Sequence, residues 1–209
     1  MIQKEEIVDN IGSFLHDFVY SKIPGKEVFE QGFAEGRKLI LLNVSPYADG
    51  MMLEVLLGIS MLEVENILHE FSNRVFHPQD ISLTYWKSLS SFSTHLPKRY
   101  FISSVSELHQ ILPDIEDVLV KKGFYWLDEF SDQQALASMM HQSIVSKEED
   151  NKNLYLMSQR SLILQKLLNN VITDALFYTY YETLQLHKAP ESQLEEFFKF
   201  RQYTEAIDL

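Results

Sequence analysis

The sequence of 209 residues contains no cysteine. Disulfides, thiolate metal sites, iron–sulfur ligation and cysteine nucleophiles are therefore excluded. No uninterrupted apolar run approaches the ~20 residues that a membrane-spanning helix needs. The first residues also lack the basic and apolar regions that make up a signal peptide. From these absences we expect a soluble, cytoplasmic protein.

Glycine is scarce as well, with seven residues, and no glycine-rich phosphate-binding stretch is present. The sequence also lacks the G-x-S-x-G turn of serine hydrolases and the H-E-x-x-H motif of zinc proteases. His69-Glu70 begins like the zinc motif, but Asn73 stands where the second histidine is required. These missing signatures favour a protein without catalysis, and we predict no cofactor.

Positive charge is in deficit, with 18 Lys and Arg against 30 Asp and Glu, for a net charge of −12. Residues 1–125 contribute −6 (11 minus 17), and residues 126–209 contribute −6 (7 minus 13). Because phosphate backbones are bound by clustered Lys and Arg, we expect no nucleic-acid partner. Anionic membrane surfaces are disfavoured for the same reason. The net negative charge either keeps the protein soluble or attracts a basic protein partner.

The spacing of apolar residues changes from helical to strand-like and back to helical. Residues 3–21 have helical spacing, and residues 28–103 contain short β-rich runs. Leu53–Ile59 alternates with a period of two, and from residue 131 on only helical spacing remains. This segregation predicts an α+β fold. We expect a small antiparallel sheet of about four to five strands within residues 28–103, packed by helices, and an all-helical C-terminal region.

Local signals predict where elements begin and end. Residues 1–130 are predicted to form a sheet domain with an N-terminal helix, and residues 131–209 a helical region packed on it, or the two form a single domain. Pro113 predicts a break in its helix. The apolar stripe within residues 164–187 predicts one long helix, and a terminal helix over 191–206 is expected to bury Phe198.

Two capping boxes predict helix starts within residues 28–130. Ser60 is followed three residues later by Glu63, and Ser104 by Glu107. In such a pair the serine hydroxyl accepts a backbone N–H of the first turn, and the glutamate reaches back to the cap. Helices are therefore expected to begin directly after Ser60 and after Ser104.

Glu54 is the first candidate for acid–base chemistry, because it is a lone carboxylate in the most apolar strand. Burial between two layers of helices would raise its pKa and suit it to act as a general acid. Alternatively, Glu54 points to solvent from a sheet that has one wet face. His69 is the second catalytic candidate. Either residue would serve a small-molecule-binding or enzymatic domain with a pocket between sheet and helices.

Glu65 and His69 are the candidate metal ligands, because a spacing of four places both on one face of a helix. His77 follows eight residues later. The same spacing also produces an ordinary surface ion pair. A working site needs three or four protein ligands, so we expect no bound metal.

The most unusual feature of the sequence is an aromatic run, Phe177-Tyr178-Thr179-Tyr180-Tyr181. Neighbouring residues on a helix differ by about 100° in direction, so these rings cannot all face one core. Tyr178, Tyr180 and Tyr181 are therefore candidate binding residues, unless the helix is sandwiched between two other elements. Our leading hypothesis is a non-catalytic protein-interaction module that uses an acidic or aromatic surface. Self-association through the C-terminal helices is compatible with it.

Overall fold

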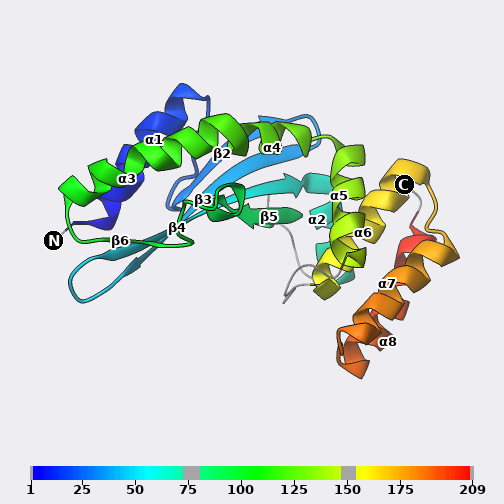
Figure 1. Ribbon diagram of the computed structural model, residues 1–209. Coiled ribbons are helices and arrows are strands. Elements are labelled where there is room, and N and C mark those ends of the chain that lie inside the picture. The colour runs from blue at the N-terminus through cyan, green and yellow to red at the C-terminus, as the bar shows by residue number, and fades with distance from the viewer. Residues whose placement is uncertain (1, 73–80, 147–153, 208–209) are drawn as a thin grey trace. The chain divides into compact units, whose positions relative to one another are not determined.

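The computed structural model describes residues 2–72, 81–146 and 154–207, and its fold is α+β (Figure 1). The described residues separate into two compact units. The sheet unit comprises Met1–Ser60 and Tyr85–Ser131, and the helical unit comprises Met61–Thr84 and Asp132–Leu209. The predicted α+β class and the all-helical C-terminal region are confirmed. The division into domains at residue 130 stays a prediction.

The sheet is open, antiparallel and six-stranded. Its strands are β1 (Ser21–Lys22), β2 (Val28–Phe33), β3 (Gly36–Pro46), β4 (Met51–Met61), β5 (Tyr85–Ser88) and β6 (Tyr100–Ile102). They run in the order β1-β2-β3-β4-β5, and β6 pairs with the first residues of β4 beside β5. The two-residue β1 lies outside the range predicted for the sheet, so the count exceeds the expected four to five.

Helices occur in both units. In the sheet unit they are α1 (Lys4–Asp17), α3 (Val105–Val118) and α4 (Phe124–Glu129). In the helical unit they are α2 (Leu62–Phe71), α5 (Gln133–Val145), α6 (Leu154–Asn169), α7 (Asp174–Leu186) and α8 (Glu191–Ala206). Among the described residues, no helix is long and apolar enough to cross a membrane.

The alternation in β4 decides which residues meet the helices of the sheet unit. Its odd-numbered residues from Leu53 to Ile59 are almost fully buried. Leu57 packs beneath Gly123, and Lys38 on β3 bonds Asp128 on α4 at 2.5 Å. Figure 1 shows α1, α3 and α4 on this same side of the sheet. Because side chains alternate along a strand, the even-numbered residues of β4 lie on the opposite face, here called the outer face.

Two predicted boundaries have different outcomes. Ser104 caps α3 as predicted, with its hydroxyl accepting the backbone N–H of Glu107 at 3.3 Å. The box at Ser60 was a wrong prediction, because Ser60 is buried in β4 and α2 begins after Met61 without a side-chain cap. The strand therefore runs directly into the helix.

The predictions of a break at Pro113 and of one long helix were also wrong. Pro113 lies inside α3, which continues through a π-helical turn at Leu119–Gly123 into α4. The long helix is divided into α6 and α7 by Asn170, whose φ of 57° is left-handed. Thr173 then caps α7 by accepting the N–H of Leu176.

The helical unit is organised around α6, which packs against α2, α5, α7 and α8. Its central residues Leu162, Ile163 and Leu164 are buried. The ring of Phe71 at the end of α2 lies 4.9 Å from the ring of Phe200 on α8. These contacts fix the position of α7, which carries the candidate binding tyrosines, and of α8 beside it.

Candidate functional site

An aromatic cluster joins α7 to α8. Phe177 is fully buried at its centre, and its ring stacks on Phe197 at 5.2 Å and meets Phe198 at 5.1 Å. Phe198 also contacts Tyr181 edge-to-face at 4.8 Å. Tyr178 packs its edge against Phe177 at 5.4 Å. The rings therefore hold one another in defined positions across the two helices.

Arg201 of α8 closes one side of this cluster. Its guanidinium carbon lies 4.7 Å above the Phe177 ring and 6.0 Å from the Tyr178 ring, within the range of cation–π attraction. Glu205 accepts from Nε at 2.7 Å, and Asp174 accepts from a terminal nitrogen. These bonds, first that with Glu205, raise the pKa of Arg201, so the cation over the rings is permanent. Arg201 had no recognisable signal in the sequence.

The outer side of the cluster is exposed. Tyr178 is 47% exposed and Phe198 37%, while Tyr181 is half-buried between them. Glu182 lies one turn from Tyr178, and Glu195 lies one turn from Phe198, and both carboxylates are exposed. We call these five residues the α7–α8 surface. Phe198 was expected to be buried, and its exposure is a correction to that expectation.

Tyr180 does not belong to this surface. It is fully buried, and its hydroxyl lies 2.8 Å from Ser161 on α6 and 3.1 Å from His141 on α5. Burial raises the pKa of Tyr180 to about 12. The prediction of Tyr180 as a binding residue is thus corrected, because its side chain joins three helices in the core. The alternative of a helix between other elements describes α7, which contacts α5 and α6 through Tyr180 and α8 through Phe177.

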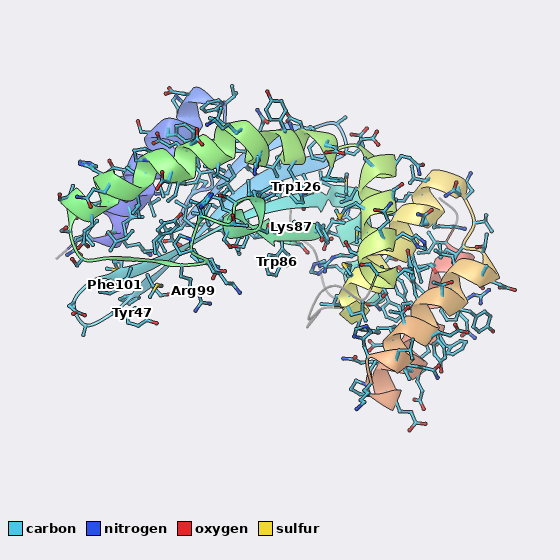
Figure 2. All side chains as sticks on the ribbon, in the orientation of Figure 1. Tyr47, Trp86, Lys87, Arg99, Phe101 and Trp126 are labelled. Carbon is cyan, nitrogen blue, oxygen red and sulfur yellow. The ribbon has the colours of Figure 1, made fainter. Side chains whose placement is uncertain are left out.

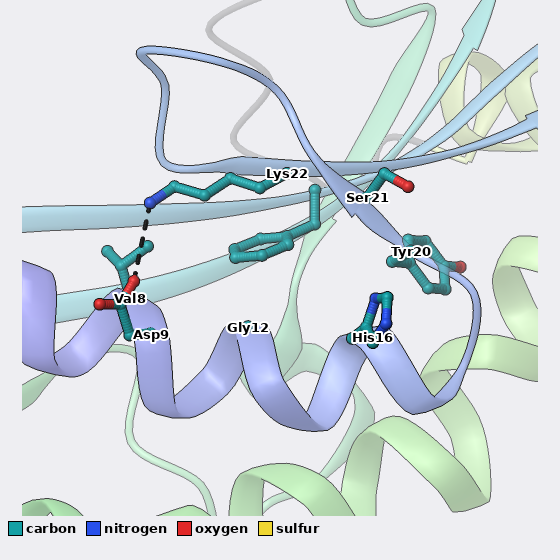
Figure 3. Close-up of a pocket in the computed structure, with 8 residues that line it drawn as sticks. Val8, Asp9, Gly12, His16, Tyr20, Ser21 and Lys22 are labelled. Carbon is teal, nitrogen blue, oxygen red and sulfur yellow. Dashed lines mark ion pairs between the residues drawn. The ribbon is translucent and has the colours of Figure 1, made fainter.

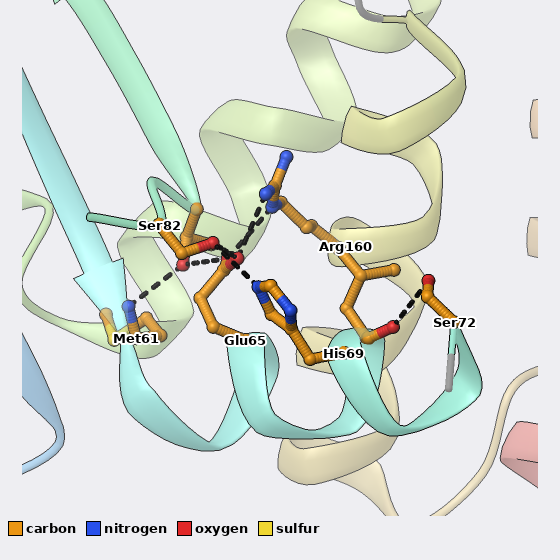
Figure 4. Close-up of polar contacts among 8 residues, drawn as sticks. Met61, Glu65, His69, Ser72, Ser82 and Arg160 are labelled. Atoms are coloured by element: carbon orange, nitrogen blue, oxygen red, sulfur yellow. Dashed lines mark hydrogen bonds and ion pairs between the residues drawn. The ribbon is translucent and has the colours of Figure 1, made fainter. Parts of the chain in front are cut away.

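Glu65 is the centre of a buried polar network in the helical unit (Figure 4). Its side chain is completely buried, and Arg160 on α6 donates to it twice, from Nε at 2.8 Å and from a terminal nitrogen at 2.9 Å. Thr84 donates to the first carboxylate oxygen at 2.8 Å, and Ser82 donates to the second. The Thr84 hydroxyl in turn accepts the N–H of Met61 at 2.9 Å. The carboxylate thereby links α2, α6 and the segment before β5.

The same contacts explain the ionisation of Glu65. Burial by itself would raise the pKa, but the bonds and charge of Arg160, helped by Ser82 and Thr84, outweigh burial and lower it. Glu65 therefore stays ionised and paired with a cation from the protein. His77 of the predicted metal set lies outside the described residues. Within residues 2–72, 81–146 and 154–207, no group of three or more His, Asp or Glu side chains could hold a metal ion.

His69 is placed one turn after Glu65 on α2. Its Nε2 lies 3.4 Å from the hydroxyl of Ser82, which itself donates to Glu65 (Figure 4). A nucleophilic serine would direct its proton to the histidine base, whereas this hydroxyl proton is directed to a carboxylate. His69 therefore lies beside the Glu65 network, and its contact with Ser82 differs from that of a catalytic base with a serine nucleophile.

Glu54 lies on the outer face of the sheet, yet only 11% of its side chain is exposed. Nε of Arg99 donates to it at 3.1 Å, and Arg99 is 58% exposed. Glu54 and Arg99 line a hollow of about 320 Å³ together with Asn43, Ser45 and Tyr47. Glu54 therefore lies on the face of β4 opposite α1, α3 and α4, and Arg99 covers its carboxylate. Its role as a general acid stays a prediction.

Exposed aromatic rings stand along this outer face (Figure 2). Phe101 on β6 is opposite Met52, and Trp86 on β5 is opposite Gly58. Trp86 is 44% exposed, Phe101 48% and Tyr47 54%. Phe101 and Tyr47 meet edge-to-face at 6.4 Å.

A second hollow lies between α1 and the strands β1 and β2 (Figure 3). It has a volume of about 370 Å³, and its floor includes Phe29 beneath Gly12, where an added Cβ would lie 2.8 Å from the ring. Asp9 and Lys22 approach each other across it at 3.9 Å. The hypothesis of a small-molecule-binding or enzymatic domain requires a pocket between sheet and helices, and this hollow lies in such a place. Glu54, the candidate acid of that hypothesis, does not line it.

Comparison of the chain with protein-family models, with curated proteins and with solved structures finds no match. The function must therefore be inferred from the geometry described above.

Proposed function

We propose that this chain is a non-catalytic protein-interaction module whose α7–α8 surface binds a basic segment of another protein. The observation that carries the proposal is the exposure of Tyr178 and Phe198, although both rings contact the buried Phe177. Tyrosine and phenylalanine are enriched in protein interfaces relative to other protein surfaces. Aromatic residues of this kind commonly supply most of the binding free energy.

The rings are held in place before any partner arrives. Arg201 stacks on Phe177 and is fixed by Glu205 and Asp174, and Phe198 contacts Tyr181 at 4.8 Å. Side chains that are already ordered lose little conformational entropy on binding. This pre-organisation supports a role as anchors.

The charge around the rings supports a basic partner. Residues 174–206 carry six acidic side chains and three basic ones, a net charge of −3. Of the three basic residues, Arg201 is occupied by Asp174 and Glu205. Glu182 and Glu195, beside the exposed rings, remain available to a cation. Complementary charge accelerates association and selects the partner, and salt weakens both effects.

The proposal is tested by quantitative affinity purification from a native lysate with the full chain as bait. Wild type is compared with the double variant Tyr178→Ala/Phe198→Ala. Tyr125→Ala serves as the matched control, because Tyr125 on α4 is 69% exposed and belongs to the sheet unit. Truncating one anchoring ring costs about 2 kcal/mol in a typical interface, or roughly 30-fold in affinity.

We expect proteins of high isoelectric point to be retained by wild type and by Tyr125→Ala, and to be lost from the double variant and at high salt. Thermal unfolding of each variant checks that the bait is folded. The proposal fails if the double variant retains the same proteins as wild type, or if wild type enriches none at any salt concentration.

A further inference from the structure

On the outer face of the sheet, Glu54 forms an ion pair with Nε of Arg99. The terminal nitrogens of Arg99 take no part in this pair. In the register of β4 with β6, Met52 is opposite Phe101 and Leu53 is opposite Tyr100. Arg99 comes directly before β6 and forms an ion pair with Glu54 of β4. Among the described residues, the side chain that donates to the carboxylate of Glu54 is Arg99, through Nε. Glu54 is nearly buried and Arg99 is largely exposed. A buried carboxylate therefore fixes the position of an exposed guanidinium.

The remaining donors of Arg99 do not bond Glu54. A guanidinium has five N–H groups. Among the residues that the structure describes, the terminal nitrogens of Arg99 have no acceptor within hydrogen-bond distance. Two terminal N–H groups in a fixed fork match the two oxygens of a carboxylate. The pairing with Glu54 also keeps the fork from rotating freely.

Apolar and polar groups lie beside the fork. Phe101 lies two residues after Arg99 in the chain, and Tyr47 packs against its ring. Figure 2 shows Arg99, Phe101 and Tyr47 gathered on the side of the sheet away from α1 and α3. Asn43 and Ser45 add exposed polar groups along the hollow. The two exposed rings therefore adjoin a set of hydrogen-bond donors.

The charged side chains around this hollow have a net charge that does not repel a ligand with one negative charge. Glu27, which also lines the hollow, is paired with Lys4 at 2.6 Å, and its pKa is lowered chiefly by that bond. Glu54 is paired with Arg99, and Lys98 beside Arg99 in the sequence is exposed. These five side chains sum to +1. A phosphate dianion would meet stronger repulsion from the two carboxylates than a carboxylate would.

We propose that Arg99, Phe101 and Tyr47 form a binding site for a carboxylate that is attached to an aromatic or aliphatic group, with Glu54 as the positioning residue. The carboxylate accepts from the terminal nitrogens of Arg99, and the apolar group packs on the Phe101 ring. The site is in the sheet unit and takes an anion, so it is independent of the α7–α8 surface.

The test is a titration of the ¹⁵N-labelled full chain, followed by NMR at the Arg99 side-chain Nε–H and the Phe101 backbone N–H. Three peptides are compared: N-acetyl-Phe with a free C-terminal carboxylate, N-acetyl-Glu-Phe-amide with a side-chain carboxylate, and N-acetyl-Gln-Phe-amide with neither. The first two distinguish the source of the carboxylate. The third controls for binding through the aromatic ring alone.

We expect saturable shifts at both N–H groups with at least one carboxylate peptide, and an affinity at least about tenfold lower for the neutral peptide. Arg99→Gln should lose binding, and Arg99→Lys, which keeps the charge, should weaken it about tenfold because lysine lacks the fork. Glu54→Gln should weaken it a few-fold through loss of positioning. Lys98→Ala, the matched control, should change affinity less than about twofold.

Equal binding of the three peptides, or unchanged binding by Arg99→Lys, would overturn the proposal. So would the absence of a saturable shift with either carboxylate peptide, because Arg99 would then serve only to cover Glu54. The backbone spectrum of each variant shows whether its fold is intact, and the charge-conserving Arg99→Lys remains informative if Arg99→Gln unfolds.

Discussion

Replacing Arg160 with methionine removes the cation that pairs with the buried carboxylate of Glu65. Methionine fills much of the same volume, so packing on α6 changes little. Glu65 keeps its bonds from Ser82 and Thr84 but loses two charge-assisted bonds, at 2.8 and 2.9 Å. The variant therefore isolates the effect of leaving a buried negative charge without its partner.

The expected loss is large because Glu65 is completely buried and Arg160 is only 16% exposed. Removing one member of a buried ion pair typically costs 3–5 kcal/mol, and we expect about 3–5 kcal/mol for Arg160→Met at pH 7. The double variant Glu65→Leu/Arg160→Met removes both charges and should recover most of that loss. Lys166→Met on the same helix, the matched control, should change stability by less than about 0.5 kcal/mol.

The pH dependence separates this mechanism from a packing defect. In wild type the pKa of Glu65 is lowered on folding, so its stabilisation is complete above the unfolded value of about 4.3 and is lost as pH falls through the lower folded value. In Arg160→Met, burial without a cation raises the folded pKa above about 4.3. The folded variant then binds a proton that the unfolded chain does not. The difference in stability between wild type and variant should therefore shrink between pH 7 and pH 4.5.

Urea unfolding at several pH values, followed by circular dichroism, measures these differences for the three variants and wild type. A loss below about 1 kcal/mol for Arg160→Met would refute the reasoning. A loss that stays constant from pH 7 to pH 4.5 would also refute it, because a cavity or a packing defect has no proton linkage.

Two further predictions concern the core of each unit. Tyr180→Phe removes the hydroxyl that meets Ser161 and His141, and should lower stability by about 1–2 kcal/mol in urea unfolding, whereas Tyr178→Phe should leave it unchanged. Gly36→Ala would place a Cβ 2.1 Å from the carbonyl oxygen of Ser60 and should cost about 2 kcal/mol or more. Gly32→Ala is its control, because a Cβ there meets no atom within 4 Å, and equal losses for the two glycine variants would contradict the steric argument.

The fold class was predictable because it depends on hydrophobic periodicity alone. The alternation of Leu53, Val55, Leu57 and Ile59 fixes the buried face of β4 whatever packs on it. Ser104 was predictable for a similar reason, since its cap bond is made within one helical turn. Patterns of this kind are predictable because the interactions that cause them lie within one strand or one helical turn.

Boundaries that depend on tertiary contacts were missed. Ser60 has the sequence of a cap, but the pairing of β4 continues to Ile59 opposite Tyr85 and keeps Ser60 in the strand. Pro113 is accommodated inside α3, which continues to Val118. In each case packing outweighs the local preference.

The candidate site was predictable only in part. The spacing of the aromatic run suggested that some of its rings face a second surface, and Tyr178 is exposed. The same spacing could not assign Tyr180 to the core, because that depends on Ser161 and His141. Arg99 reaches Glu54 across 45 positions of the chain, Arg160 reaches Glu65 across 95, and Arg201 reaches Asp174 across 27. A partner at such a distance leaves no periodic signal in one sequence.

The most direct test of the interaction proposal is site-specific photo-crosslinking of the full chain in a native lysate. A benzoylphenylalanine is placed at Glu182, next to Tyr178 on the α7–α8 surface, or at Tyr125 as the control position. We predict a discrete crosslink to a basic protein from position 182 that is absent from position 125, weakens with salt and is lost when Phe198→Ala is added. The same crosslinks from both positions, or none from position 182, would contradict the proposal.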